Sequence, residues 1–204
     1  MICCRLRLVK HAADWTYPIS GSFDLEEHVQ NEPLPENLAA LAKLLEQYAS
    51  GSGRITPRPR GARLDSDTRA VLEAAVIAVE DAGKPASRPD ELMVFGNGCY
   101  SAGRYAAAAE AFLTILNNDP SMADARFNLG LTYLRLRSPE DAVQEFTNLL
   151  VQKPWLAEAF YQRGNGNDDL GNMDQALADY TRAIELAPDY VHAMYNRGIL
   201  LAQT

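Results

Sequence analysis

Apolar positions recur along most of the chain at the three- and four-residue spacing of an amphipathic helix. The stretch 124–136 carries one such stripe, which consists of Phe127, Leu131 and Leu134. A second stripe follows Ser138 and Pro139 and consists of Ala142, Phe146, Leu149 and Leu150. Each stripe predicts a helix with one buried face. Because proline suits a first helical turn, the two stripes predict a hairpin of two helices.

The first part of the chain predicts two more helices joined by an irregular segment. One covers 35–48, with its apolar stripe at Leu38, Leu41, Leu44, Leu45 and Tyr48. The other covers 67–82, with its stripe at Leu72, Ala75, Val76 and Val79. Residues 50–63 between them are rich in glycine, proline and arginine, which is typical of a loop. Residues 1–33 mix isolated aromatic residues with turn formers, so we expect an irregular arm there.

Residues 89–204 repeat the helical hairpin at a constant interval. Four series of residues keep a spacing of 34, namely Gly96, Gly130, Gly164 and Gly198; Ala108, Ala142 and Ala176; Pro120, Pro154 and Pro188; and Phe112, Phe146 and Tyr180. Residue types that stay in phase over several cycles indicate a solenoid of stacked hairpins. The glycines and alanines predict that paired helices approach closely, and the aromatic residues fill the gap to the next pair.

These series resemble the tetratricopeptide repeat family, and residues 174–188 are close to its consensus. The resemblance implies an all-α fold, a right-handed α-α superhelix with an N-terminal helical extension. Together with the patterns before residue 89, it divides the chain into an irregular arm (1–33), two helices that cap the solenoid (34–88) and a repeat domain (89–204). The repeats are expected at 89–122, 123–156 and 157–190, followed by a terminal helix at 191–204.

The family consists mainly of interaction scaffolds, and the first helix of each pair lines a concave groove. Matching the pattern places ten residues in that groove, which are Asn97, Asp124, Phe127, Asn128, Glu158, Tyr161, Gln162, Asn165, Tyr195 and Asn196. Aromatic rings offer flat apolar contact, and side-chain amides donate and accept hydrogen bonds toward a peptide main chain. We therefore expect the groove to bind an extended peptide of another protein. The alternative is that these polar side chains are only solvated.

One specialisation of the family is absent from this pattern. Some members hold the acidic C-terminal tail of heat-shock chaperones with a clamp of two lysines, an arginine and two asparagines. Asn97 and Asn128 match the asparagines, but the basic positions hold Met93, Glu158 and Gln162. Without cations nothing neutralises the carboxylates of such a tail, and Glu158 repels them. We therefore predict that the chain does not bind it.

The first helix of the third repeat departs from the family pattern. Asn167 replaces the usual aromatic residue, and Gly166 adds a second glycine to the helix interior. Each interior glycine costs about 1 kcal/mol relative to alanine. The glycines lack the spacing of a nucleotide-binding motif. We therefore expect this to be the weakest helix of the solenoid.

The chain is acidic, with a formal net charge of −8, and residues 89–204 carry nearly all of that excess. Such a surface disfavours nucleic acid and anionic membranes and favours a neutral or basic peptide as partner. The chain also contains basic segments of its own, at Arg54–Arg63 and at Arg5, Arg7 and Lys10. One hypothesis is that one of these segments lies in the acidic groove of the same molecule.

The candidate reactive residues form no catalytic or metal-binding pattern. Cys3 and Cys4 have no zinc-site spacing with each other or with His11 and His28. Cys99 falls in a repeat helix, where we expect a small core residue. The three histidines have no nucleophile or acid at a catalytic spacing. We therefore expect no enzyme activity, no cofactor and no metal. We also expect a cytoplasmic protein, because the sequence shows neither a secretion signal nor a membrane span.

Two alternatives to a groove scaffold remain. Small acidic proteins with three such repeats behind a helical segment resemble the chaperones of bacterial type III secretion (class II-like). The chain also ends in half a repeat, in which Ile199 and Leu200 lack the covering helix of the other repeats. We expect this helix to be a terminal cap. The alternatives are a homodimeric assembly factor that associates through it, or a natural chain that is longer.

Overall fold

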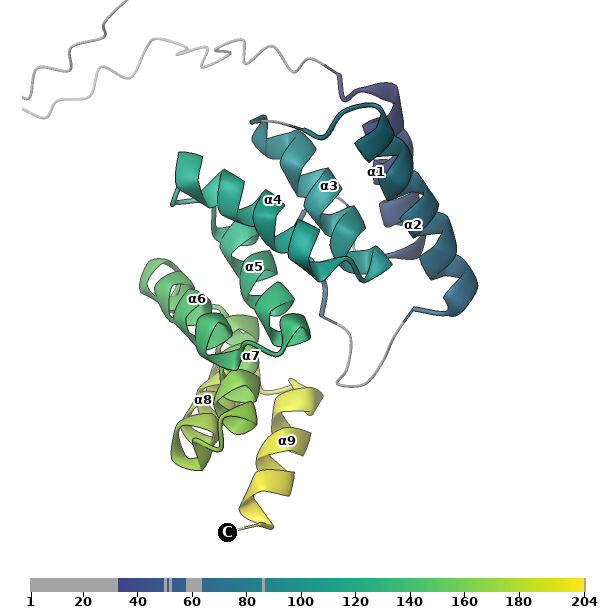
Figure 1. The fold of residues 1–204 in the computed structure, drawn as a ribbon. Coiled ribbons are helices and arrows are strands. Elements are labelled where there is room, and N and C mark those ends of the chain that lie inside the picture. Colours follow the sequence, from purple (N-terminus) through teal and green to yellow (C-terminus); the bar gives the residue numbers. More distant parts are fainter. Residues whose placement is uncertain (1–32, 50, 52, 58–63, 86, 204) are drawn as a thin grey trace, which may run out of the picture. The chain divides into compact units, whose positions relative to one another are not determined.

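The structure is a computed structural model that describes residues 33–49, 51, 53–57, 64–85 and 87–203. The chain divides into two units, Met1–Pro33 and Leu34–Thr204, and almost all of the described residues belong to the second. Within the described residues the fold is all-α and comprises nine helices (Figure 1). The arm predicted for 1–33, with its cysteines and two of the histidines, lies outside the described residues except for Pro33. None of the helices described is both long enough and apolar enough to cross a membrane.

Two helices precede the repeats. α1 covers Glu36–Tyr48 and α2 covers Ser66–Asp81, each within one residue of the bounds that the apolar stripes predict. Asp65 caps α2, since its side chain accepts a hydrogen bond from the main-chain N–H of Thr68 (2.8 Å). Both helices pack against α3. Their buried residues belong to the predicted stripes and are Leu38, Leu41, Leu45, Leu72, Val76 and Val79.

Seven helices follow, and each packs against the next along the chain (Figure 1). They are α3 (Pro89–Ala102), α4 (Tyr105–Asn118), α5 (Ala123–Leu136), α6 (Pro139–Gln152), α7 (Ala157–Asp169), α8 (Met173–Leu186) and α9 (Val191–Leu201). Successive first helices also meet, α3 with α5 and α5 with α7. This arrangement of antiparallel pairs is the solenoid that the repeat predicts, and it places α3, α5 and α7 side by side.

Within each of the three pairs, the repeat glycine lets an aromatic ring of the second helix touch the backbone of the first. A Cβ atom on Gly96 would lie 2.6 Å from the ring of Phe112. The same atom on Gly130 would lie 2.7 Å from Phe146, and on Gly164 it would lie 2.7 Å from Tyr180. No side chain fits at such distances, so packing requires glycine at all three positions.

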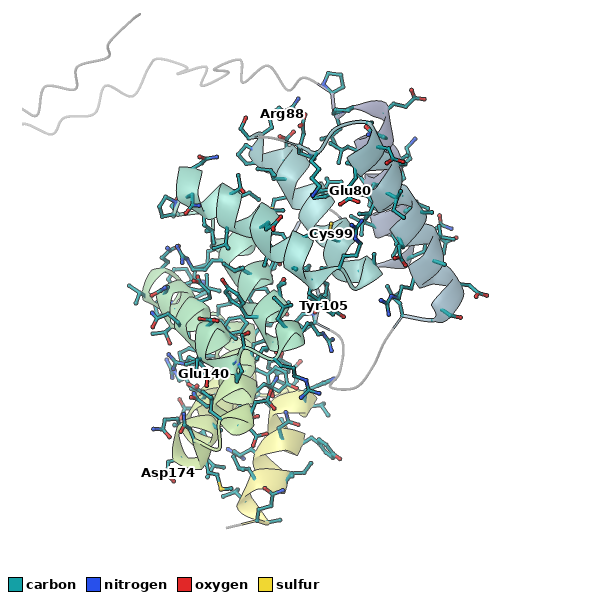
Figure 2. All side chains as sticks on the ribbon, in the orientation of Figure 1. Glu80, Arg88, Cys99, Tyr105, Glu140 and Asp174 are labelled. Carbon is teal, nitrogen blue, oxygen red and sulfur yellow. The ribbon has the colours of Figure 1, made fainter. Side chains whose placement is uncertain are left out.

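The interface between α2 and α3 contains the cysteine of the repeat region. Cys99 on α3 and Glu80 on α2 lie where the two helices meet (Figure 2). Glu80 forms an ion pair with Arg104 (2.6 Å) beside it. Cys99 is fully buried, and burial raises the pKa of its thiol to about 12. The residue is therefore a small core residue, as its place in the repeat predicts.

Candidate peptide-binding site

The connection between α1 and α2 contacts the first helices of the repeats. It is about 17 residues long (residues 49–65), whereas most helix–helix connections need roughly 2–8 residues. Gly51, Gly53, Arg54 and Ile55 of this connection, which we call the bound segment, touch side chains of α3, α5 and α7. A long connection that packs on other elements is usually functional.

Two asparagines hold the main chain of the bound segment. Asn97 on α3 donates its side-chain amide to the carbonyl oxygens of Gly53 (2.7 Å) and Gly51 (3.3 Å). Asn128 on α5 accepts a hydrogen bond from the N–H of Ile55 (2.8 Å) and donates one to the carbonyl of Gly53 (3.2 Å). Asn128 also donates to Asn97 Oδ1 (2.9 Å). The pair therefore recognises main-chain groups, which every peptide carries.

Two side chains of the bound segment add specificity to this main-chain contact. The guanidinium of Arg54 pairs with Glu158 on α7 (2.8 Å) and lies over the ring of Phe127, 5.1 Å from its centroid. Such a cation over an aromatic face is attracted by the ring quadrupole. Ile55 is 3% exposed and belongs to the main hydrophobic core. Arg54 therefore contacts two of the predicted groove residues, as the hypothesis of a basic segment in the groove requires. The other basic residues of that hypothesis lie outside the described residues, so for them it stays a hypothesis.

A second pair of asparagines repeats the first pair two repeats later. Asn196 on α9 donates to Asn165 Oδ1 on α7 at 2.9 Å. Asn165 also donates to Gln162 Oε1 (3.1 Å) and accepts a hydrogen bond from the hydroxyl of Tyr180 (3.0 Å). Asn196 makes a longer bond to the hydroxyl of Tyr161 (3.3 Å). In the described part of the chain, no main-chain atom bonds to the side chain of Asn165 or Asn196.

The ten predicted groove residues therefore fall into three sets. Asn97, Phe127, Asn128 and Glu158 surround the bound segment. The hydrogen bonds of the second pair join Tyr161, Gln162, Asn165 and Asn196. Asp124 in the first turn of α5 and Tyr195 on α9 are exposed. Phe127 is fully buried, so it takes part through the ring face that Arg54 covers.

The position of α7 is fixed by a buried ionic network with α8. Arg163 on α7 donates two hydrogen bonds to the carboxylate of Asp179 on α8 (2.6 and 3.0 Å). Asn167 donates a third to the same carboxylate (3.1 Å). Planar two-point contacts of this kind restrict geometry as well as adding attraction. The network holds the helix that carries Asn165, and it gives Asn167 a role that the family pattern did not predict.

Sequence analysis missed the part of the site that the chain itself supplies. Arg54 was considered for its charge, but the main-chain contacts of Gly51, Gly53 and Ile55 were not predicted. Main-chain recognition leaves almost no mark in a sequence. The available signal was Ile55, an isolated aliphatic residue in a loop of glycine, serine, proline and arginine.

The phenol of Tyr190 near the second pair stays neutral rather than supplying acid–base chemistry. Tyr190 packs its ring against Tyr161, with the centroids 5.0 Å apart. Burial, and then the nearby charge of Glu158, raises the pKa of the Tyr190 phenol. Among the residues described, no group of three or more His, Cys, Asp and Glu side chains is placed to hold a metal ion. The arrangement offers amides and ring faces, which suit recognition of a peptide.

Comparison with known proteins bears on this site. Models of the tetratricopeptide repeat match residues 95–154 and 157–190. No curated protein sequence matches the chain. Among solved structures, the crystal structure of MamA has a TM-score of 0.60 and 20% identity, and the match covers 70% of this chain and 86% of MamA.

Two other similar structures are described with a peptide-binding site or a bound peptide. YrrB, described as a TPR protein with an unusual peptide-binding site, has a TM-score of 0.55 and 21% identity, with 65% of each chain covered. The first TPR of Spaghetti (RPAP3), solved with the HSP90 peptide SRMEEVD, has a TM-score of 0.52 and 20% identity. That match covers 70% of this chain and 98% of the other. At these identities the likeness establishes the fold.

Proposed function

The chain is a tetratricopeptide-repeat protein, and from this premise we propose that it is an interaction scaffold that binds an extended peptide segment of a partner protein. The binding face is the one that carries the ten predicted groove residues on α3, α5, α7 and α9, which we call the inner face. The family as a whole serves mainly in protein–protein interaction, and the structures of YrrB and Spaghetti are described with a peptide site or a bound peptide.

The bound segment is the observation that carries this proposal. Asn97 and Asn128 hold three main-chain groups of alternate residues, the carbonyls of Gly51 and Gly53 and the N–H of Ile55. Side-chain amides with this geometry are a ready-made receptor for extended backbone. A surface that binds main-chain groups of its own chain has the chemistry to bind those of another.

The expected partner is neutral or basic. The cation that meets Glu158 here belongs to the bound segment itself, and the chain as a whole carries a net charge of −8. An acidic peptide such as SRMEEVD brings carboxylates, and the three basic positions of a carboxylate clamp hold Met93, Glu158 and Gln162. We therefore expect no binding of that peptide.

A displayed library of unstructured peptides tests the proposal. A photo-reactive amino acid is placed at Asp124 or Tyr195, which are exposed on the inner face, and at Val151 on α6, which is 81% exposed. Selected peptides are expected to cross-link at Asp124 or Tyr195 and not at Val151. Selection of no peptide, or cross-linking at Val151 alone, would contradict a function on the inner face.

Self-association through α9 is the second candidate, because that helix exposes apolar side chains. They are Val191, Met194, Tyr195, Ile199 and Leu201. A homodimer through this helix predicts a concentration-dependent mass in sedimentation equilibrium that Ile199→Asp abolishes. A monomer at all concentrations would exclude this candidate. No observation in the structure favours a type III secretion chaperone over a general scaffold, and a cytoplasmic location stays a prediction from the sequence.

A further inference from the structure

We propose that Asn165, Tyr195 and Asn196 form a second peptide site, which binds a partner segment made of a small residue, an arginine and an aliphatic residue. This inference rests on the proposed function and names the class of peptide that the inner face selects. The model for the ligand is the bound segment, in which Gly53, Arg54 and Ile55 lie at the first asparagine pair.

The internal repeat makes the two sites equivalent. A shift of two repeats, 68 residues, takes Asn97 to Asn165 and Asn128 to Asn196. The hydrogen bond within each pair is 2.9 Å and runs in the same direction, from the later asparagine to the earlier one. The other partners of the second pair differ, because Asn165 donates one amide hydrogen to Gln162 and Asn196 donates one to Tyr161. The second amide hydrogen of Asn165 and the Oδ1 atom of Asn196 therefore remain for a ligand.

The aromatic residue of the site follows the same shift. Phe127, whose ring lies beneath the guanidinium of Arg54, corresponds to Tyr195. Phe127 is fully buried, whereas Tyr195 is 67% exposed. The equivalent ring thus lies open to solvent at the second site. Arg197 does not compete for it, because residues two positions apart on a helix do not face each other.

The bound segment already occupies the first site and closes it to a partner. Ile55 is 3% exposed and forms part of the core, and the main chain beside it is held by both asparagines. A tethered segment also acts at an effective concentration in the millimolar range. A free peptide is therefore expected to meet the second site, where the described chain presents amides and a ring without a main-chain segment between them.

The ligand chemistry follows from the groups that the second site offers. The Oδ1 atom of Asn196 corresponds to the atom of Asn128 that accepts the Ile55 N–H, so it suits the N–H of a residue that follows an arginine. The Tyr195 ring suits the arginine, because a guanidinium is attracted to the face of an aromatic ring. The residue before the arginine is small because its carbonyl must approach the asparagines closely, as Gly53 does at 2.7 Å.

The probe for this proposal is the chain's own sequence 49–57, Ala-Ser-Gly-Ser-Gly-Arg-Ile-Thr-Pro, as a free peptide. It is titrated into the full ¹⁵N-labelled chain, and amide signals are followed by NMR. We expect the signals of Tyr195 and the side-chain amide of Asn196 to move, while the Ile55 main-chain signal stays in place. Tyr195→Ala is expected to weaken binding about threefold or more, in line with a cation–aromatic contact.

Matched controls distinguish binding at this site from nonspecific binding. Trp155 has the same exposed fraction as Tyr195, 67%, so Trp155→Ala is expected to leave the affinity unchanged. A peptide with glutamate in place of arginine is expected to bind at least tenfold more weakly. A peptide methylated on the isoleucine nitrogen, which cannot donate to Asn196, is expected to lose binding as well.

Four results would overturn the inference. They are failure of the probe to bind at millimolar concentration; movement of the Ile55 signal, which places the peptide at the first site; equal binding of the glutamate peptide; and equal effects of Tyr195→Ala and Trp155→Ala. None of these results removes the proposed function, which stands or falls on whether library peptides cross-link at Asp124 or Tyr195 rather than at Val151.

Discussion

The side chain of Asn128 donates to Asn97 Oδ1 at 2.9 Å, and both side chains also bind the main chain of Gly53. This network is buried, and each amide hydrogen in it has an acceptor. Asn128 Oδ1 meanwhile accepts from Ile55, so the side chain must present its oxygen and its nitrogen in one orientation. A buried network of this kind tolerates a change of shape poorly and a change of donors even less.

Asn128→Asp is therefore expected to destabilise the protein. The aspartate keeps the acceptor for Ile55, but it turns a carboxylate oxygen toward Asn97 Oδ1 and the Gly53 carbonyl. Loss of the donors and burial of a charge are expected to lower the free energy of unfolding by about 2–4 kcal/mol at pH 7. The loss shrinks as pH falls, since the protonated acid has no charge. Urea unfolding measures both effects.

The control for this prediction is Asn148→Asp on α6. Asn148 Oδ1 accepts a hydrogen bond from Gln144 (3.0 Å), and an aspartate keeps that acceptor. We expect a change of less than about 0.5 kcal/mol, as for a substitution away from buried networks. Equal losses for the two variants would show that the Asn97–Asn128 network has no special role.

The ion pair between Arg54 and Glu158 is expected to contribute little to stability. Its side chains are 34% and 36% exposed, and partly exposed pairs typically couple by about 0.2–1 kcal/mol. A double-mutant cycle with Arg54→Ala and Glu158→Ala isolates this coupling from the contact of Arg54 with Phe127. The coupling is expected to fall in 1 M salt. A value above 2 kcal/mol at that salt concentration would contradict the prediction.

The fold was predictable because it depends on residues that recur. The glycine, alanine and aromatic series place helix against helix, and the structure pairs Gly96 with Phe112 and Gly130 with Phe146 as that period requires. The candidate site was predictable only as far as it follows the same period. The bound segment lies outside the repeat, and its main-chain contacts depend on where residues 49–65 fold back, which no periodic signal records.

The thiol of Cys99 is expected to be unreactive in the folded protein. Burial raises its pKa to about 12, so roughly one thiol in ten thousand is ionised at pH 8, and the thiolate is the reactive form. In a Cys3→Ser, Cys4→Ser variant, labelling with a thiol reagent is expected only as fast as the chain unfolds. The same variant in denaturant labels at once. Native labelling that rises tenfold per pH unit from pH 7 to 8 and levels off near pH 9 would indicate an ordinary thiol.

The sequence prediction for Gly166 was incomplete, because it considered the residue's helix propensity and not its packing. Its helical propensity predicts a weak helix, but its Cβ position would lie 2.8 Å from a methyl group of Val143 and 3.5 Å from the carbonyl of Pro139. The glycine therefore permits α7 to approach α6. The cost in propensity is local and visible in the sequence, whereas the gain in packing comes from another helix and is not.

A pair of glycine substitutions separates these two effects. Gly166→Ala gains about 1 kcal/mol of helix propensity but drives a methyl group into Val143, and overpacking costs about 1–3 kcal/mol. Gly198, inside α9, has nothing within 4 Å of its Cβ position in the described chain, so Gly198→Ala is expected to stabilise by about 0.5–1 kcal/mol. Thermal and urea unfolding should therefore give changes of opposite sign.

In a Val143→Ala background the clash is relieved, and Gly166→Ala should then become neutral or stabilising. Stabilisation by Gly166→Ala in the unaltered chain would mean that α7 and α6 do not pack this closely, and the close approach that places Asn165 would be wrong with it.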